Sequence, residues 1–90
     1  MAGRLDGNVA IVTGGSRGIG RAIAVALAGE GAAVVLAART PATLAEAADL
    51  VRRAGGQAEP VVTELADEQS IRNLVRMTNE KFGRLDILIN

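Results

Sequence analysis

Four glycines stand in the stretch Thr13-Gly14-Gly15-Ser16-Arg17-Gly18-Ile19-Gly20, and three of them, Gly14, Gly18 and Gly20, have the unequal spacing four then two. An apolar, β-branched run over residues 9–13 precedes this turn, and a segment with apolar residues at helical spacing follows it. Where a strand turns into a helix without bulky side chains, an anion can approach the unpaired N–H groups of the helix N-terminus. The stretch therefore predicts a strand, a phosphate-binding turn and a helix, as in dinucleotide-binding proteins.

Three of these glycines have a predicted role. Gly14 allows the tight turn out of the strand, Gly18 lets a phosphate approach the backbone, and Gly20 lets the helix pack closely on the sheet. A glycine-rich turn that binds nothing is the alternative, and the strand before it and the helix after it argue against that alternative. We expect the cofactor contacts of this turn to come from Gly14, Ser16, Arg17, Gly18, Ile19 and Gly20.

A P-loop is the competing phosphate-binding motif, because residues 15–20 also satisfy its glycine spacing. A P-loop continues with a lysine that reaches the phosphates and a hydroxyl that holds magnesium. Arg21 and Ala22 occupy those two positions here. Hydrolysis of ATP or GTP is therefore not expected.

Four short apolar runs recur at nearly equal intervals, over residues 9–13, 34–38, 58–62 and 85–89. Segments with helical periodicity separate them, which predicts an α/β fold in which parallel strands alternate with helices. The runs are apolar throughout, as in a sheet whose two faces are both covered by helices. We expect a doubly wound parallel sheet of Rossmann type that stops after its fourth strand, with the first two helices on one face and the third on the other.

The three expected helices carry apolar faces and terminal signals. The expected inward faces are Ile19, Ala22, Ile23, Ala26 and Leu27 in the first helix, Leu44, Ala48 and Val51 in the second, and Ile71, Leu74, Val75, Thr78 and Phe82 in the third. Thr40 and Asp67 are expected to cap the second and third helices, and Gly83 to end the third.

Composition restricts the chemistry further. The chain has 90 residues, 49% of them hydrophobic, which predicts one domain over residues 1–90, an incomplete dinucleotide-binding unit. Cys, His, Trp and Tyr are all absent, which excludes a thiolate nucleophile, a His-paired serine, an imidazole zinc site and a tyrosine acid within these residues. The numbers of acidic and basic residues are equal, so the chain has no net positive charge to attract nucleic acid or an acidic membrane. We expect a cytoplasmic protein with no nucleic-acid, membrane or metal partner.

The end of the second expected strand indicates which nicotinamide cofactor would bind. Dinucleotide folds place an acidic residue there for the ribose hydroxyls of NAD, or a cation for the 2'-phosphate of NADP. This chain has Arg39 at that position, and Arg17 can reach the same phosphate from the glycine-rich turn. Both arginines could instead be solvated surface charges. NADP(H) is therefore expected in preference to NAD.

Thr13-Gly14 followed by Gly18 and Gly20 resembles the Thr-Gly-x-x-x-Gly-x-Gly turn of the short-chain dehydrogenase/reductase family. Residues 85–90, Leu-Asp-Ile-Leu-Ile-Asn, are similar to the family's fourth strand and the start of its Asn-Asn-Ala-Gly motif. The resemblance covers essentially the whole chain. It implies an oxidoreductase that acts on carbonyls or alcohols, similar to 3-oxoacyl-acyl-carrier-protein reductases and homo-oligomeric in its full form.

The resemblance also implies roles for residues after the third and fourth strands. Glu64-Leu65 stands where the family usually has an aspartate that recognises the adenine, and the alternative is a solvated glutamate. Asn90 is implied to support the cofactor-binding loop after the fourth strand, although it could equally be a residue of a strand-end turn.

The family's catalytic tyrosine, lysine, serine and asparagine follow the fourth-strand motif, so none is expected in this chain. Tyr is absent, and Lys81, the sole lysine, is expected near the end of the third helix. The first hypothesis is the cofactor-binding part of an NAD(P)-dependent enzyme. The alternatives are a non-catalytic dinucleotide-binding module and a fragment without function. With the chain ending at Asn90, we also expect an exposed apolar patch over the first and fourth strands.

Overall fold

Strands and helices alternate along residues 3–90, which the computed structural model describes. The elements are β1 (Val9–Thr13), α1 (Gly18–Gly29), β2 (Ala33–Ala38), α2 (Pro41–Arg53), β3 (Gln57–Val62), α3 (Glu68–Phe82) and β4 (Ile87–Ile89). This order confirms the expected alternation. Residues 1 and 2 of the expected domain lie outside the described residues.

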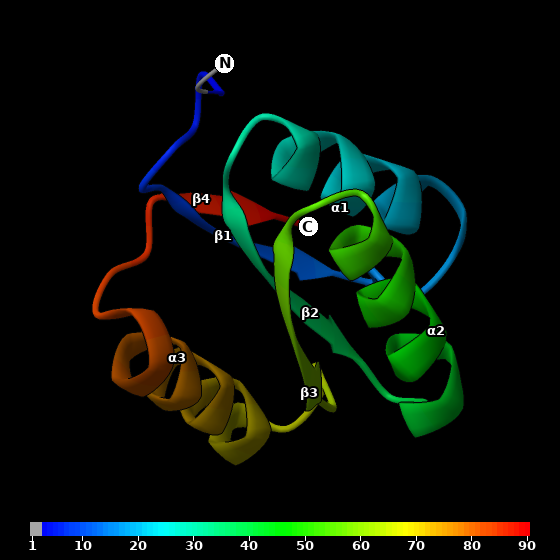
Figure 1. The fold of residues 1–90 in the computed structure, drawn as a ribbon. Coiled ribbons are helices and arrows are strands. Elements are labelled where there is room, and N and C mark those ends of the chain that lie inside the picture. The colour runs from blue at the N-terminus through cyan, green and yellow to red at the C-terminus, as the bar shows by residue number, and fades with distance from the viewer. Residues whose placement is uncertain (1–2) are drawn as a thin grey trace.

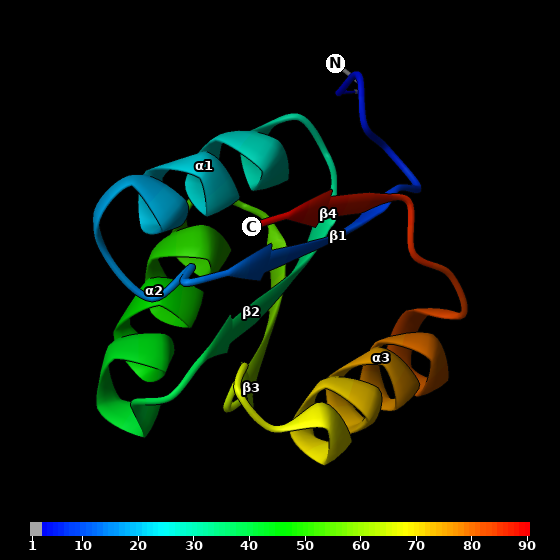
Figure 2. The same ribbon diagram turned by 180° about the vertical axis from the view of Figure 1, so that it is seen from behind.

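The strands form one parallel sheet in the order β3-β2-β1-β4. α1 and α2 lie on one face of this sheet and α3 lies on the other (Figure 1), and the view from behind shows the same layers (Figure 2). This is the expected Rossmann-type arrangement. The chain crosses from β3, at one edge, to β4 at the other, so the direction of winding reverses beside β1.

Each face of the sheet has its own apolar core. Val12 and Leu36 contribute to the core beneath α1 and α2, whereas Ile11 and Val35 contribute to the core beneath α3. Neighbouring residues of β1 and β2 therefore point to opposite faces, and both faces are covered. This explains why these strands are apolar throughout.

The expected inward face of α1 is mostly wrong, although Leu27 packs against the core. Ala24 and Ala28 are the buried residues of this helix, whereas Ile19 is 81% exposed. Ala22 and Ala26 are exposed as well, and Ile23 and Leu27 are half-buried. The small alanine side chains let the helix lie close to the sheet and to α2, so the burial follows the smallest residues and not the largest.

The expected face of α2 is confirmed, because Leu44, Ala48 and Val51 are buried. That of α3 is only half right: Leu74 and Thr78 are buried, but Ile71 and Val75 are exposed. α3 packs on residues of β1, β2 and β3, whereas Ile71 and Val75 border an open hollow that Leu85 also lines.

The expected apolar patch is also partly misplaced. Ile11 and Val12 of β1 are fully buried, so this strand contributes nothing to an exposed surface. Near β4, exposed apolar side chains lie on the strand itself, on the loop before it and on the flank of α3; they are Leu88, Leu85, Ile71 and Val75. Helices on both faces cover β1, whereas β4 lies at an edge of the sheet.

The terminal signals of the helices have mixed outcomes. Asp67 caps α3 by accepting a hydrogen bond of 3.0 Å from the backbone N–H of Gln69, and Gly83 ends the helix with φ 76°. Thr40 precedes α2 as expected, but its hydroxyl makes no capping hydrogen bond. The Thr43 hydroxyl instead donates to the Thr40 carbonyl over 3.1 Å, and Pro41 fixes the first turn.

β4 is shorter than expected, since Leu85 and Asp86 lie before it. The Asp86 carboxylate accepts 2.8 Å hydrogen bonds from the Val9 N–H and from the Arg84 Nε, and its own N–H donates to the Val9 carbonyl over 2.9 Å. These bonds replace ladder pairing at the amino end of β4.

Candidate dinucleotide-binding site

The carboxyl ends of β1, β2 and β3 border a pocket of about 250 Å³. Parallel strands bring their carboxyl ends to one edge of the sheet, and ligands of doubly wound sheets bind at that edge. The pocket is lined by Gly14, Ser16, Arg17, Ala37, Ala38, Arg39, Thr40, Thr43, Thr63, Glu64 and Leu65.

The glycine-rich turn closes by contact between its two ends. Gly14 has φ 68°, a left-handed conformation that favours glycine, and its N–H donates to the Ala37 carbonyl over 2.8 Å. A Cβ on Gly20 would overlap the carbonyl oxygen of Gly14. The predicted reason for glycine at position 14 is confirmed. At position 20 the close neighbour is the turn itself, not the sheet.

The N-terminus of α1 follows this turn, and no acidic side chain of the helix's own first turn lies there. Arg17 is its extended N-cap residue and makes no side-chain capping bond. Gly18 follows with φ 63°, and the space beside its α-carbon is open. The unpaired N–H groups and the positive end of the helix dipole are therefore available to a phosphate.

Two arginines and one glutamate bring charge to the pocket. Arg17 comes from the turn after β1, Arg39 follows β2, and Glu64 follows β3. The Arg39 guanidinium lies 3.7 Å from the Glu64 carboxylate, with side-chain exposures of 77% and 48%. The site therefore holds two cations, of which one faces a carboxylate.

The structure brings most of the predicted site residues together. Gly14, Ser16, Arg17, Arg39, Glu64 and Leu65 line the pocket, whereas Gly18, Ile19, Gly20 and Asn90 do not. Gly18, Ile19 and Gly20 begin α1 beside it, and Asn90 follows β4 at the same edge of the sheet. Their contact with a cofactor stays a prediction.

Sequence reasoning missed three threonines of this pocket, Thr40, Thr43 and Thr63. Thr63 directly follows β3, so the rule that ligands lie at the carboxyl ends of parallel strands could have found it. Thr40 and Thr43 flank the start of α2 and carry no comparable signal. They add hydroxyl groups beside Arg39.

The carboxyl ends of β1 and β4 are fastened beside the pocket. The Thr13 hydroxyl donates a 3.0 Å hydrogen bond to the Ile89 carbonyl. Asn90 follows directly, so this bond helps to fix where the residue lies. The reversal of winding described above occurs at these two strands.

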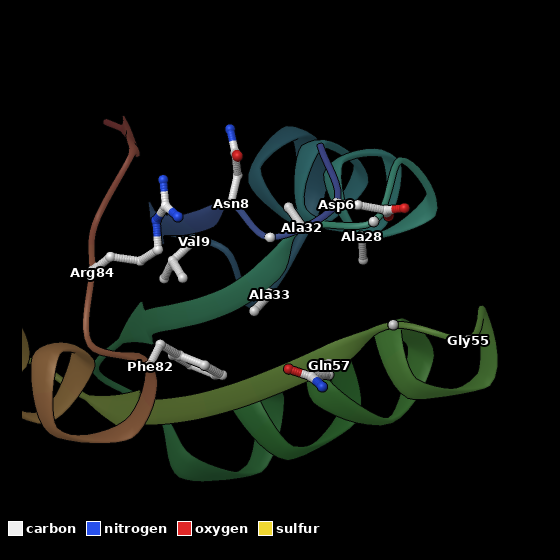
Figure 3. A pocket seen from close by; sticks show the side chains of 13 residues that line it. Asp6, Asn8, Val9, Ala28, Ala32, Ala33, Gly55, Gln57, Phe82 and Arg84 are labelled. Carbon is white, nitrogen blue, oxygen red and sulfur yellow. The ribbon is translucent and has the colours of Figure 1, made fainter. Parts of the chain in front are cut away.

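A larger hollow of about 430 Å³ lies at the opposite edge of the sheet, among Asn8, Gln57, Phe82 and Arg84 (Figure 3). The C-termini of α1, α2 and α3 reach this edge, and their carbonyl ends disfavour an anion. Arg84 is already paired with Asp86 over 2.7 Å. A dinucleotide's phosphates therefore fit the smaller pocket better.

No helix within residues 3–90 has the length and apolar character needed to cross a membrane.

The model of the family described as short chain dehydrogenase matches residues 8–90. The chain belongs to the short-chain dehydrogenase family. The match includes the glycine-rich turn, all four strands and all three helices. The family confirms the resemblance found in the sequence and agrees with the observed fold.

The chain is also similar to individual dehydrogenases. The bovine (Bos taurus) hydroxysteroid dehydrogenase-like protein 2 is 43% identical over 95 residues, which cover 98% of this chain and 23% of that protein. The chain thus spans about a quarter of the length of this curated relative.

Two solved structures show the same fold. The glucose dehydrogenase of Caenorhabditis elegans, in its apo form, is 39% identical with a TM-score of 0.92, covering 97% of this chain and 38% of that one. A 7α-hydroxysteroid dehydrogenase in complex with NADH and 7-oxo glycochenodeoxycholic acid is 37% identical with a TM-score of 0.93, covering 97% and 34%. Both structures share the sheet and helices described above.

Proposed function

We propose that these residues form the NADP(H)-binding part of a short-chain oxidoreductase that transfers hydride between the nicotinamide and a carbonyl or alcohol. The observation that carries this proposal is the meeting of the open N-terminus of α1 with Arg17 and Arg39 in one pocket. Membership of the dehydrogenase family supports it.

The residues of the pocket fit a dinucleotide with a 2'-phosphate. A side chain at position 20 would overlap the backbone of Gly14. Because Gly20 has no side chain, the turn can take the close form that phosphate binding needs. The helix N-terminus suits the pyrophosphate, and a guanidinium suits the extra phosphate because it can donate two parallel hydrogen bonds. No carboxylate stands at the end of β2, where NAD-binding proteins hold the ribose hydroxyls.

Each group has a definite task in this proposal. Gly14, Ser16, Gly18, Ile19 and Gly20 form the backbone cradle and its walls. Arg17 and Arg39 bind the 2'-phosphate, Glu64 and Leu65 border the adenine, and Asn90 supports the loop after β4. The bound cofactor supplies the hydride donor or acceptor, and this chain holds and orients it.

The choice of NADP over NAD rests on this chain's own residues. One structural relative holds NADH, so the comparison with known structures lends no support to NADP. The exposed Arg39 after β2 favours NADP because it faces the pocket without a carboxylate on its own strand end. The substrate class, homo-oligomeric assembly and cytoplasmic location belong to the proposal for the longer parent protein. So does the closer likeness to 3-oxoacyl-acyl-carrier-protein reductases.

A non-catalytic dinucleotide-binding module is a second candidate, and one observation favours it. The chain contains no Tyr, His or Cys and a single lysine, Lys81, which pairs with Glu59 over 3.6 Å. Lys81 lies near the end of α3, away from the carboxyl edge of the sheet. The two candidates agree on cofactor binding and differ only in whether further residues of a parent add catalysis.

Titration of the chain with NADPH and NADH tests the shared step. Nicotinamide fluorescence reports binding without interference, because the protein has neither Trp nor Tyr. The proposal expects saturable binding with a lower Kd for NADPH. Folded chain, verified by circular dichroism, that binds neither nucleotide would contradict both candidates. Equal affinity for both would contradict the NADP preference alone.

A further inference from the structure

The Glu64 carboxylate and the Arg39 guanidinium face each other across the mouth of the candidate pocket. We propose that Glu64 is a specificity-determining residue whose carboxylate competes with the 2'-phosphate for Arg39. The inference rests on the proposed function and deepens it. It predicts that this chain favours NADP(H) less strongly than its two arginines alone would allow.

Glu64 is anchored where it can act on Arg39. One carboxylate oxygen, Oε1, accepts a 3.1 Å hydrogen bond from the backbone N–H of Ala66, and the other, Oε2, lies 3.7 Å from Arg39. The Glu64 N–H donates to the Ser70 hydroxyl over 2.8 Å. Backbone and side chain are thus both fastened to the segment that begins α3, and the carboxylate is held at the pocket.

The second arginine of the pocket has no such competitor. Within residues 3–90, no carboxylate lies within 4.0 Å of the Arg17 guanidinium. Arg17 also belongs to the turn after β1, on a different strand end from Glu64. An effect of Glu64 on the 2'-phosphate should therefore pass through Arg39.

Exposure sets the size of the effect. Both side chains are at least 48% exposed, so water screens their attraction and the incoming phosphate can displace the carboxylate. Exposed ion pairs of this kind shift an equilibrium by up to about fivefold. Glu64 should therefore weaken binding of a 2'-phosphate by about two- to fivefold without preventing it.

The test compares two ligands that differ only in the 2'-phosphate, adenosine 2',5'-bisphosphate and adenosine 5'-monophosphate. Dissociation constants come from ¹H–¹⁵N correlation spectra of the wild-type chain and of Glu64→Gln. The glutamine keeps an oxygen for the Ala66 N–H but loses the charge. We expect the bisphosphate to gain about two- to fivefold relative to the monophosphate. Using the ratio cancels any change in adenine recognition.

Two further variants make the result specific. Glu80→Gln removes the same charge from an exposed ion pair with Arg76 on α3, away from the pocket, and should leave the ratio unchanged. In an Arg39→Met background, Glu64→Gln should no longer change the ratio. A change that persists there would mean that Glu64 repels the phosphate directly, which would overturn competition for Arg39.

The remaining outcomes separate this inference from the proposed function. If the wild-type chain binds both ligands and Glu64→Gln leaves their ratio unaltered, the inference is wrong while cofactor binding stands. Equal weakening of both ligands by Glu64→Gln would assign Glu64 to the adenine and would also overturn it. If the folded wild-type chain binds neither ligand, the proposed function fails and the inference fails with it.

Discussion

Gly20 lies so close to Gly14 that a Cβ at position 20 would overlap the Gly14 carbonyl oxygen and lie 2.9 Å from the carbonyl carbon. The first turn of α1 thus rests directly on the residue that leaves β1. Both atoms in the way belong to the backbone, which cannot move aside as a side chain can. The close turn, and with it the open helix N-terminus, depends on glycine at position 20.

Gly20→Ala should therefore destabilise the chain by about 1–3 kcal/mol, the usual range for overpacking, and should weaken nucleotide binding as well. Gly29→Ala is the matched control, since nothing lies within 4 Å of a Cβ there. That change should be neutral or stabilising by up to about 1 kcal/mol. Urea unfolding measures both. Equal stability of the two variants would show that the Gly14–Gly20 contact does not constrain the turn.

Arg39→Asp should reverse the cofactor preference. The substitution removes the cation proposed for the 2'-phosphate and supplies a carboxylate for the ribose hydroxyls of NADH. We expect the ratio of the two Kd values to change by at least about tenfold, because a charge-assisted hydrogen bond is lost and a repulsion is gained.

Fluorescence titration with NADPH and NADH measures this reversal. Arg72→Asp, on α3 and away from the pocket, makes the same change in net charge and should leave the preference unaltered. An unchanged preference in Arg39→Asp would show that Arg39 is only a surface charge.

Thr13→Val should loosen β4. The substitution keeps the shape of the side chain but leaves the Ile89 carbonyl without the 3.0 Å bond, which costs about 1 kcal/mol. Amides of β4 should exchange with solvent faster. Thr43→Val should cost less, because the Thr40 carbonyl that its hydroxyl contacts is exposed to water. Unaltered exchange in β4 would contradict a fastening role for Thr13.

Acid should weaken the attachment of β4 at its other end. Hydrogen bonds from Arg84 and from the Val9 N–H hold the pKa of Asp86 below its ordinary value of 3.8. A carboxylate whose pKa is lower in the folded state stabilises the fold above its ordinary pKa and loses that contribution as the pH falls through the folded value.

The free energy of unfolding of the wild type should therefore fall toward that of Asp86→Asn as the pH drops below 3.8, with the wild type more stable at neutral pH. Unfolding curves of both proteins across this range measure the difference. A constant difference between them would contradict the contribution of the Asp86 charge.

Much of the fold could be predicted because the strands are set by continuous apolar runs and the helix ends by Pro41, Asp67 and Gly83. The inward face of α1 could not. The residues of α1 are apolar on nearly every side of the helix. Which of them are buried, Ala24 and Ala28, depends on how closely the helix approaches the sheet. The distance between a helix and the sheet cannot be obtained from the periodicity of the sequence. The short length of β4 likewise depends on hydrogen bonds between Asp86 and the distant Val9.

The candidate site shows a similar division. The positions of Gly14, Ser16, Arg17 and Arg39 at one pocket could be predicted, since they directly follow the carboxyl ends of β1 and β2. The opposition of Arg39 and Glu64 was not, because it depends on two side chains from different strand ends meeting across a pocket. Thr43 was missed because a threonine in the first turn of a helix carries no signal of a binding site.

We propose that a nicotinamide dinucleotide binds at the carboxyl edge of the sheet. The most direct measurement is an NMR titration of the ¹⁵N-labelled chain with NADPH, with chemical-shift changes assigned to residues. We expect the largest changes to cluster at Gly14, Arg17, Arg39 and Glu64, which line the smaller pocket. Changes that cluster instead around Asn8, Gln57 and Arg84 at the opposite edge, or no saturable change in folded protein, would contradict it.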